Sequence, residues 1–213
     1  MDFSQFLNLI PKIIESSLTG AISHDKMAPL ERKKIMEDFD FDSNNHRKAA
    51  ILMLVYPKND IAHLVLIVRN SYSGVHSSQI AFPGGKVDPE DKSFVETALR
   101  ETFEEIGISP NEINVIRSFS EIFIPPSNFL VYPFLGFSTQ NLSFIPDPKE
   151  VATIIECPLS ELLNDENKIL KRMATSYSKN IEVPAYQVNE HIVWGATAMI
   201  LSELKDVFDA INL

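Results

Sequence analysis

A helix bounded by glycines and crowded with carboxylates constrains this chain more than any other stretch. Ser93 and Glu96 have the spacing of a capping box, and Gly107 stands where a helix needs a left-handed terminating residue, so residues 93–106 predict a helix. Pro83-Gly84-Gly85 lies one short loop upstream, and two adjacent glycines permit a tight backbone turn against that helix. The sequence therefore predicts a loop–helix–loop unit.

The predicted helix carries its carboxylates on one side. Glu101 and Glu104 are three positions apart and Glu101 and Glu105 are four apart, a spacing that brings side chains together on a helix. Such like charges repel, and a divalent cation relieves the repulsion, because hard oxygen ligands suit Mg²⁺ or Mn²⁺ bound together with substrate phosphates. Arg100, four positions before Glu104, can orient that carboxylate. A solvated acidic helix face is the alternative, and the neighbouring glycine loop favours the metal site.

Composition agrees with a compact soluble enzyme. The 213 residues are 45% hydrophobic and 23% charged, which suffices for one sizeable core. No uninterrupted apolar run is long enough to predict a membrane span, and the N-terminus lacks the basic region of a signal peptide. The single cysteine, Cys157, lies in an apolar run that predicts a core position, and it fits a reducing cytoplasm. A net charge of −10 argues against broad nucleic-acid binding.

Strands and helices alternate along the chain. Residues 3–18 predict an amphipathic helix with Pro11 as a kink, and the polar connection at 19–46 contains a short helix near 29–38. Strands are expected at 49–56, 62–68, 113–124, 129–137 and 151–156, then a helix at 158–164, a hairpin-like segment at 170–195 and a helix near 197–210. The pattern predicts one α/β domain with helices on both sides of a mixed sheet.

Two segments of the predicted loop–helix–loop carry a family resemblance. FPGG at 82–85 followed by RETFEEIG at 100–107 resembles the Nudix box of nucleoside-diphosphate-linked hydrolases, except that Thr102 holds a place usually taken by a bulky apolar residue. One residue more than in the general box separates Gly85 from Arg100, and the glutamate expected between them has no exact counterpart, although Glu90 and Asp91 lie nearby. The extra residue resembles the coenzyme A pyrophosphatase subfamily.

A second motif of that subfamily precedes the box. Arg69, Gln79 and Phe82 fall in register with it, whereas Gly74 replaces an expected arginine and Ser78 an expected glycine. Further similarity lies at 126–129, 132–134, 150–152 and 192–198, so the resemblance spans about residues 46–205.

The resemblance implies a Nudix-type α/β/α sandwich with a mixed sheet and a loop–helix–loop metal site. Residues 46–213 would form the hydrolase domain, and residues 1–45 an N-terminal helical arm packed on it. A packing role is favoured for the arm. The alternative is that the arm reaches the substrate through the side chains His24, Lys26, Met27 and Arg32. The apolar N-terminal helix packs either on its own domain or across a homodimer, and the resemblance favours the homodimer.

The resemblance also implies roles for individual residues. Glu101 and Glu105 would be the firmest ligands of Mg²⁺ or Mn²⁺, with Glu104 and the Gly85 carbonyl as further ligands and Arg100 as an orienting partner. The general base is either a box glutamate or a residue of a later loop, for which the candidate is Glu150. Substrate contacts are expected from Arg69 and Lys86 to phosphates and from Phe82 and Phe129 to an adenine or pantetheine group, while Trp194 is expected in the core.

Three functions compete on these grounds. The leading hypothesis is metal-dependent hydrolysis of coenzyme A or its thioesters to 3′,5′-ADP and a 4′-phosphopantetheine product. The second keeps the chemistry but takes NADH, ADP-ribose or another nucleoside diphosphate derivative, and the departures at Gly74 and Ser78 support it. The third is a non-catalytic Nudix-like ligand-binding domain, which the complete set of box carboxylates argues against.

Overall fold

Strand β1 (Arg47–Lys58) sends alternate side chains into two separate hydrophobic cores. Successive residues of a strand point to opposite faces of a sheet, so a strand that is apolar at every position needs cover on both sides. One core receives Ala49, Met53 and Val55. The other receives Ala50, Leu52, Leu54 and Tyr56. The computed structural model, which describes residues 1–37, 46–70, 79–174 and 181–211, therefore has a sheet covered on both faces.

The main sheet is mixed. Its central order is β3-β2-β1-β7-β5, with β4 paired to β1, β6 to β7 and β8 to β2. Strands β1 and β7 run parallel and every other pairing in this sheet is antiparallel. The strands that join β1 are β2 (Ile61–Arg69), β3 (Ile80–Ala81), β4 (Gly84–Lys86), β5 (Asn114–Ser118), β6 (Ile122–Ile124), β7 (Phe129–Phe137) and β8 (Val151–Pro158).

A second, antiparallel sheet follows in the chain. It has the order β11-β10-β9, from β9 (Lys168–Met173), β10 (Ile181–Val188) and β11 (His191–Trp194). Residues 170–195, predicted as hairpin-like, therefore form three strands. The helices are α1 (Phe3–Glu15), α2 (Ala21–Asp25), α3 (Leu30–Glu37), α4 (Phe94–Ile106), α5 (Leu159–Leu163) and α6 (Gly195–Ile211).

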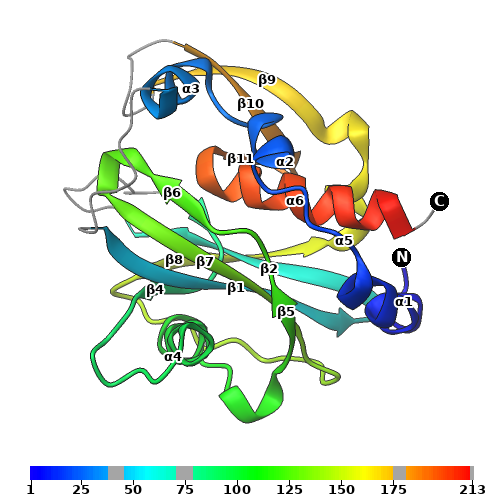
Figure 1. Cartoon of the computed structure of the whole chain (residues 1–213). Helices are drawn as coiled ribbons and strands as arrows, with labels where there is room; N and C mark the ends of the chain where they lie inside the picture. The colour runs from blue at the N-terminus through cyan, green and yellow to red at the C-terminus, as the bar shows by residue number, and fades with distance from the viewer. Residues whose placement is uncertain (38–45, 71–78, 175–180, 212–213) are drawn as a thin grey trace.

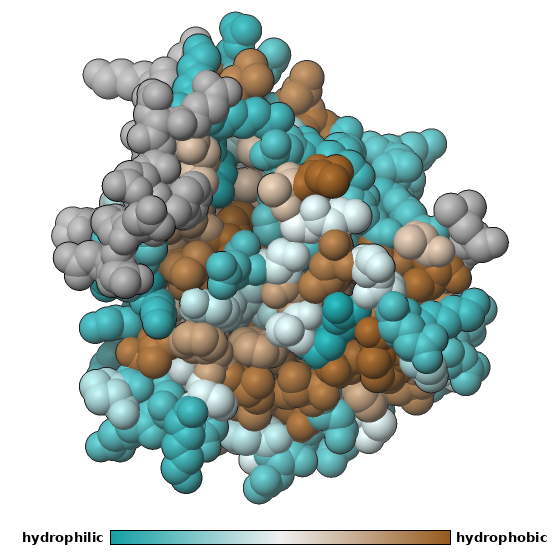
Figure 2. Space-filling model, viewed as in Figure 1, coloured by the Kyte–Doolittle hydropathy of each residue, from teal (hydrophilic) through white to brown (hydrophobic). Residues whose placement is uncertain are grey.

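The helices lie on both sides of the main sheet. Figure 1 shows α4 below the sheet and α6 above it, with α2 and α3 on the α6 side. This arrangement confirms the predicted α/β/α sandwich with a mixed sheet. On the face seen in Figure 2, hydrophobic atoms gather across the middle, at the level of the sheet, and hydrophilic atoms dominate above and below. No helix within the described ranges is both long and apolar enough to cross a bilayer.

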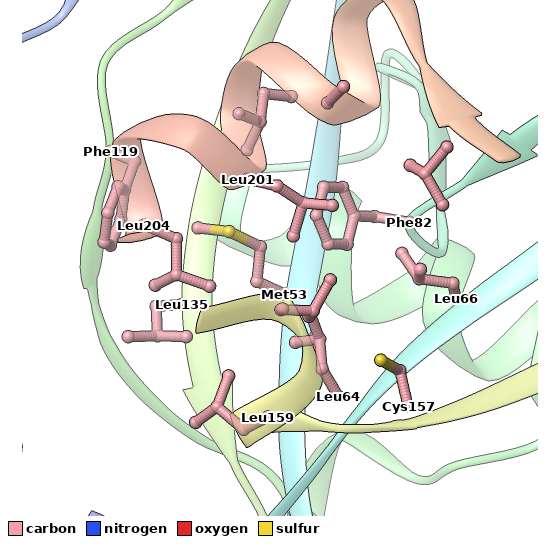
Figure 3. Close-up of a cluster of buried hydrophobic side chains, with 14 of the residues drawn as sticks. Met53, Leu64, Leu66, Phe82, Phe119, Leu135, Cys157, Leu159, Leu201 and Leu204 are labelled. Atoms are coloured by element: carbon pink, nitrogen blue, oxygen red, sulfur yellow. The ribbon is translucent and has the colours of Figure 1, made fainter. Parts of the chain in front are cut away.

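The core on the α6 side is built from strands and helices far apart in sequence. In Figure 3, Met53 of β1, Leu64 and Leu66 of β2 and Leu201 of α6 converge on one apolar volume. Cys157 points into the same volume and is fully buried, as predicted, and burial raises the pKa of its thiol to about 12. A thiol so protonated is a poor nucleophile.

Two local features depart from, or refine, the predicted elements. β1 and β2 are joined at Asn59 and Asp60, which both adopt positive φ (49° and 62°), so the hairpin has a two-residue turn with the twist that suits it. The strand predicted at 113–124 is two strands instead. β5 has a register shift between Val115 and Arg117 and ends at Ser118. Ser120, in the connection to β6, donates with both its amide and its hydroxyl to Glu203 of α6.

The N-terminal segment packs on the same face as α6. α1 contains Pro11 and contacts α6, β2 and β5, and it ends where Arg117 Nη1 donates to the carbonyls of Ile13 (2.7 Å) and Ser16 (2.8 Å). A guanidinium at this end of a helix satisfies carbonyl groups that have no partner within the helix.

Candidate active site

The glycine loop lies directly against helix α4. β4 pairs with β1, with Gly85 opposite Ala50 and Gly84 opposite Ile51, and this places both glycines beside the carboxylates of the helix. The Gly84 amide donates to Glu105 Oε2 (2.8 Å). A Cβ on Gly85 would collide with the carboxylate of Glu101. The lack of a side chain at Gly85 is thus what lets the Glu101 carboxylate approach the loop.

Helix α4 begins and ends close to where it was predicted. Ser93 caps it by accepting from the Glu96 amide (3.1 Å), and Gly107 ends it in the left-handed region at φ 77°. The predicted capping box is only half formed, because the Glu96 side chain accepts from the Lys92 amide and not from Ser93. The cap still satisfies a free donor of the first turn.

The three box glutamates do not share one environment. Glu105 is buried against the glycine loop, and the side chain of Glu101 is 14% exposed, whereas that of Glu104 is 55% exposed. Glu101 and Glu104 accept from the same Arg100 nitrogen, Nη1, at 3.0 and 3.1 Å. The helix therefore directs Glu101 and Glu105 toward the loop and holds Glu104 at the rim.

Arg100 is anchored by an aspartate outside the helix. Its Nε and Nη2 atoms each donate to Asp91 at 2.9 Å, and Nη2 also donates to the Lys86 carbonyl. Asp91 further accepts from Thr97 Oγ1 (2.8 Å). The hydrogen bonds from Arg100 hold the pKa of Asp91 below its usual range. The sequence indicated Asp91 only as a neighbour of the expected box glutamate, because its pairing with Arg100 spans nine positions.

The Asp91–Arg100 contact gives a prediction. In Asp91→Asn, the side chain at 91 loses its charge and one of the two oxygens that accept hydrogen bonds from Arg100. We expect the free energy of unfolding to fall by roughly 2 kcal/mol, the usual scale for hydrogen bonds to charged groups. Hydrolysis should fall by about tenfold, because a partner that orients a ligand carboxylate is disturbed. Urea unfolding and kcat measure the two effects, with the exposed Asp88→Asn as the matched control. An unchanged kcat would assign Arg100 a purely structural role.

Burial and mutual repulsion raise the pKa values of the inner carboxylates. Burial raises the pKa of Glu105 to about 7, and the charges of Glu101 and Glu150 add to the rise, while Arg69 and the Gly84 amide oppose it. Burial also raises the pKa of Glu101, and Glu104 and Glu150 contribute in the same direction. Glu150, exposed at the start of β8, is therefore near enough to both inner carboxylates to repel them.

This shift predicts a stability change with pH in the absence of metal. The folded-state pKa of Glu105 lies above its ordinary value of 4.5. Between pH 4.5 and about 7 the folded protein therefore binds more protons than the unfolded chain, and its stability falls as pH rises through that window. Relative to wild type, the metal-free Glu105→Gln protein should gain up to about 3 kcal/mol between pH 4.5 and 8. Chemical unfolding in a chelator at a series of pH values tests this. A difference that is constant with pH would contradict it.

The residues present fit a divalent cation. Glu105 Oε1 is buried and accepts no hydrogen bond within the described part of the chain, although Arg69 Nη1 lies 3.1 Å from it. The Glu101 carboxylate lies against Gly85. Glu105 and Glu101 thus supply carboxylate oxygens that neutral hydrogen-bond partners do not fully satisfy and that are available as metal ligands. Among the described residues, no three acidic, histidine or cysteine side chains surround one point, and the box carboxylates form ion pairs with Arg100 and Arg69. Carboxylate oxygens of this kind suit Mg²⁺ or Mn²⁺.

A cavity of about 340 Å³ opens on the other side of the glycine loop. Its lining includes Gly84 and Gly85, so it adjoins the carboxylates across the loop backbone. The described lining residues include three cations, Arg32, Arg69 and Lys86, and no carboxylate. The remaining lining is largely apolar and includes Ile51, Phe82, Phe129, Val131, Trp194 and Ile200. In a chain with a net charge of −10, this combination suits a ligand with both anionic and apolar parts.

The structure brings together in this cavity four residues proposed from sequence as substrate contacts, Arg69, Lys86, Phe82 and Phe129. Trp194 was expected in the core and instead lines the cavity. The sequence predicted its place just before a helix, but not that the first turn of this helix, α6, forms part of the cavity wall. Gly74 and Ser78 lie outside the described residues.

Of the four arm residues considered for a substrate contact, three are held away from the cavity and one lines it. Met27 is fully buried, His24 is buried beside Glu203, and Lys26 pairs with Asp206. Arg32 alone of the four lines the cavity.

Fold and site together define a class of hydrolase that combines a mixed sheet, a carboxylate helix and a glycine loop at the mouth of a nucleotide-sized cavity. The NUDIX domain family matches residues 45–177. The chain belongs to the Nudix hydrolase family. NudL of Photorhabdus laumondii, described as an uncharacterized Nudix hydrolase, is 35% identical over 162 residues, which cover 76% of this chain and 85% of that protein.

Other relatives and solved structures agree. The Arabidopsis thaliana protein named Nudix hydrolase 15, mitochondrial, is 31% identical over 189 residues, covering 86% of this chain and 64% of its own. The structure of RenU, a Nudix hydrolase of M. smegmatis, shares the fold with a TM-score of 0.54 at 16% identity, over 79% of this chain and 89% of that chain. A MutT/nudix family protein of Enterococcus faecalis also has a TM-score of 0.54, at 18% identity, over 87% and 72% of the two chains. These two likenesses support the fold alone. Family membership makes the chain a hydrolase of nucleoside diphosphate derivatives that uses divalent metal ions.

Proposed function

We propose that the substrate is coenzyme A or one of its thioesters, cleaved at the pyrophosphate to 3′,5′-ADP and a 4′-phosphopantetheine product. The observation that carries this proposal is the cavity beside the glycine loop, with its three cations, its apolar lining and no carboxylate among its described residues. Coenzyme A has a phosphate at the 3′ position and a pyrophosphate at the 5′ position of its ribose, followed by a long, weakly polar arm. A ligand with a single compact charged group would leave much of the apolar lining unused.

The residues divide the work of hydrolysis. Glu101 and Glu105, with Glu104 and the Gly85 carbonyl, would hold Mg²⁺ or Mn²⁺, and Arg100 keeps Glu101 and Glu104 in place. When bound, such ions neutralise phosphate charge and acidify water. Arg69 and Lys86, which line the cavity, would bind the pyrophosphate oxygens. Glu150 is the proposed general base: water adds to one phosphorus, the bridging P–O bond breaks, and the Glu150 carboxylate takes the proton of the water.

The apolar lining also predicts how the substrate lies. Phe82 is almost fully buried at the cavity wall, and the Arg47 guanidinium lies 4.1 Å from the ring centroid of Phe129, which is only partly buried. The Phe129 ring would stack against an adenine or the pantetheine arm, and Phe82 would contribute to the apolar wall. We assign these two side chains to binding and not to chemistry.

A product-resolved panel tests the proposal. Coenzyme A, acetyl-coenzyme A, NADH and ADP-ribose would each be incubated with wild type and with Glu105→Gln, in Mg²⁺ and in Mn²⁺. Selective release of 3′,5′-ADP from the coenzyme A compounds supports the proposal. Release of AMP from NADH or ADP-ribose, without cleavage of coenzyme A, keeps the family chemistry and overturns the substrate. The second outcome is the one that the replacements at Gly74 and Ser78 favour.

Assembly and location remain predictions. A homodimer would be detected by light scattering, and a cytoplasmic location by fractionation of cells that express the protein.

A further inference from the structure

The N-terminal arm forms one wall of the cavity. Pro29 and Arg32, at the start of α3, line it together with the glycine loop and the first turn of α6. These two residues precede the segment 45–177 that matches the NUDIX domain family. The wall is therefore formed in part by residues outside the matched domain segment.

The arm is held in place immediately before this wall. Glu203 of α6 is fully buried and accepts from the Gly20 amide (2.7 Å), while Lys26 donates to both carboxylate oxygens of Asp206 at 2.7 Å. Met27 and Ala28 follow and are buried in the core on the α6 side. Because these contacts fix residues 20–28 on α6, they also set the position of Pro29 and of the first turn of α3. The helix that positions this wall, α6, is thus the same one that lines the cavity.

The three cavity cations enter from different directions. Arg69 and Lys86 belong to β2 and β4, whose ends meet the glycine loop and the box carboxylates. Arg32 comes from α3, which Figure 1 shows on the opposite side of the sheet from α4. A substrate whose pyrophosphate lies at the glycine loop would therefore meet Arg32 with another part of the molecule.

We infer that Arg32 is a specificity-determining residue that binds a phosphate monoester of the substrate outside the scissile pyrophosphate. This inference rests on the proposed function, in which the 3′-phosphate of coenzyme A is that group. A guanidinium matches a phosphate with two parallel hydrogen bonds, which makes arginine a selective reader of such a group. The surrounding apolar lining of the cavity strengthens the interaction, because it lowers the local dielectric.

The test compares two substrates that differ only in this phosphate. The ratio of kcat/KM for coenzyme A to that for dephospho-coenzyme A would be measured for wild type, Arg32→Gln, Arg32→Lys and Lys34→Gln. Lys34 is an exposed cation of the same helix, outside the cavity lining, so it controls for loss of charge on α3. We expect Arg32→Gln to lower the ratio by roughly 10- to 100-fold, the scale of a charge-assisted hydrogen-bonded pair. Arg32→Lys should lower it less, and Lys34→Gln should leave it as in wild type.

A purely structural role for Arg32 would reduce both kcat/KM values together and leave the ratio unchanged, and this result would overturn the inference. If wild type cleaves neither coenzyme A compound, the proposed substrate fails, and the same ratio is measured with NADPH and NADH, which also differ by one phosphate monoester. A loss of preference in Arg32→Gln on that pair would support the inference independently of coenzyme A. The inference would be overturned if wild type preferred neither coenzyme A over dephospho-coenzyme A nor NADPH over NADH.

Discussion

Replacing Glu105 by glutamine is expected to remove hydrolysis and leave the fold intact. Glutamine keeps the size of the side chain and its acceptor for the Gly84 amide, so the packing of α4 on the glycine loop should survive. The charge that a divalent cation needs is lost. We expect kcat to fall by about 10³-fold or more, which corresponds to ~4 kcal/mol of lost electrostatic stabilisation in the transition state. Rates at saturating Mg²⁺ and thermal unfolding of the metal-free protein measure the two sides of this prediction.

The control is Glu90→Gln, which makes the same change of charge at an exposed position before α4. It should keep nearly all activity. A second readout separates loss of metal from loss of fold: Mg²⁺ should raise the melting temperature of wild type and of Glu90→Gln, and raise that of Glu105→Gln much less. If Glu105→Gln retained more than a tenth of the wild-type kcat, Glu105 would be a structural carboxylate, and the metal site would have to be built without it.

The two adjacent glycines should respond to alanine in opposite ways. A Cβ on Gly84 would lie within 3.0 Å of the backbone of β1, at Ala50 and Ile51, and Gly84 has a φ of +148°, which side-chain-bearing residues rarely adopt. Neither obstacle can move without distorting the central strand of the sheet. Gly84→Ala should therefore cost about 3 kcal/mol of stability or more.

Gly85→Ala should instead impair activity with little loss of stability. Here the three atoms nearest to the added Cβ all belong to the carboxylate of Glu101, the end of a flexible side chain, and Gly85 adopts no positive φ. Glu101 can swing aside, but it then leaves the position beside the loop, and kcat should fall by about 10²-fold. Chemical unfolding and kcat of the two single variants serve as mutual controls. Equal stability losses in both variants would show that the Gly85 contact is part of the fold and not of the site.

Much of the fold could be predicted from periodicity and from local turn chemistry. The continuous apolar run of β1 predicts a strand buried on both faces, and the Asn59-Asp60 pair supplies a hairpin turn, so those elements follow from residues that are neighbours in sequence. The break between β5 and β6 was not predicted, although it falls at the polar residues Ser118, Ser120 and Glu121. The partner of Ser120 in this connection, Glu203, lies 83 positions away, and such a contact cannot be read from neighbouring residues.

The candidate site divides in the same way. The helix spacing of Glu101 and Glu105 and the adjacent glycines predicted their association, since a helix and a tight turn are local structures. Three other features depend on contacts across the fold and could not be predicted locally. Glu104 remains half exposed, Asp91 anchors Arg100, and Trp194 lines the cavity and is not in the core. Arg32 is the extreme case, because nothing in its own helix indicates which cavity the arm will close.

One part of the cavity wall is synthesised late, close to the end of the described chain. The carboxylate helix is complete by residue 106, but one wall of the cavity is the first turn of α6, where Thr197 Oγ1 donates to the Ile80 carbonyl of β3 at 2.9 Å. A nascent chain that lacks α6 therefore contains every proposed metal ligand but not this part of the cavity wall. We expect the cavity to be completed only when α6 has folded onto the sheet.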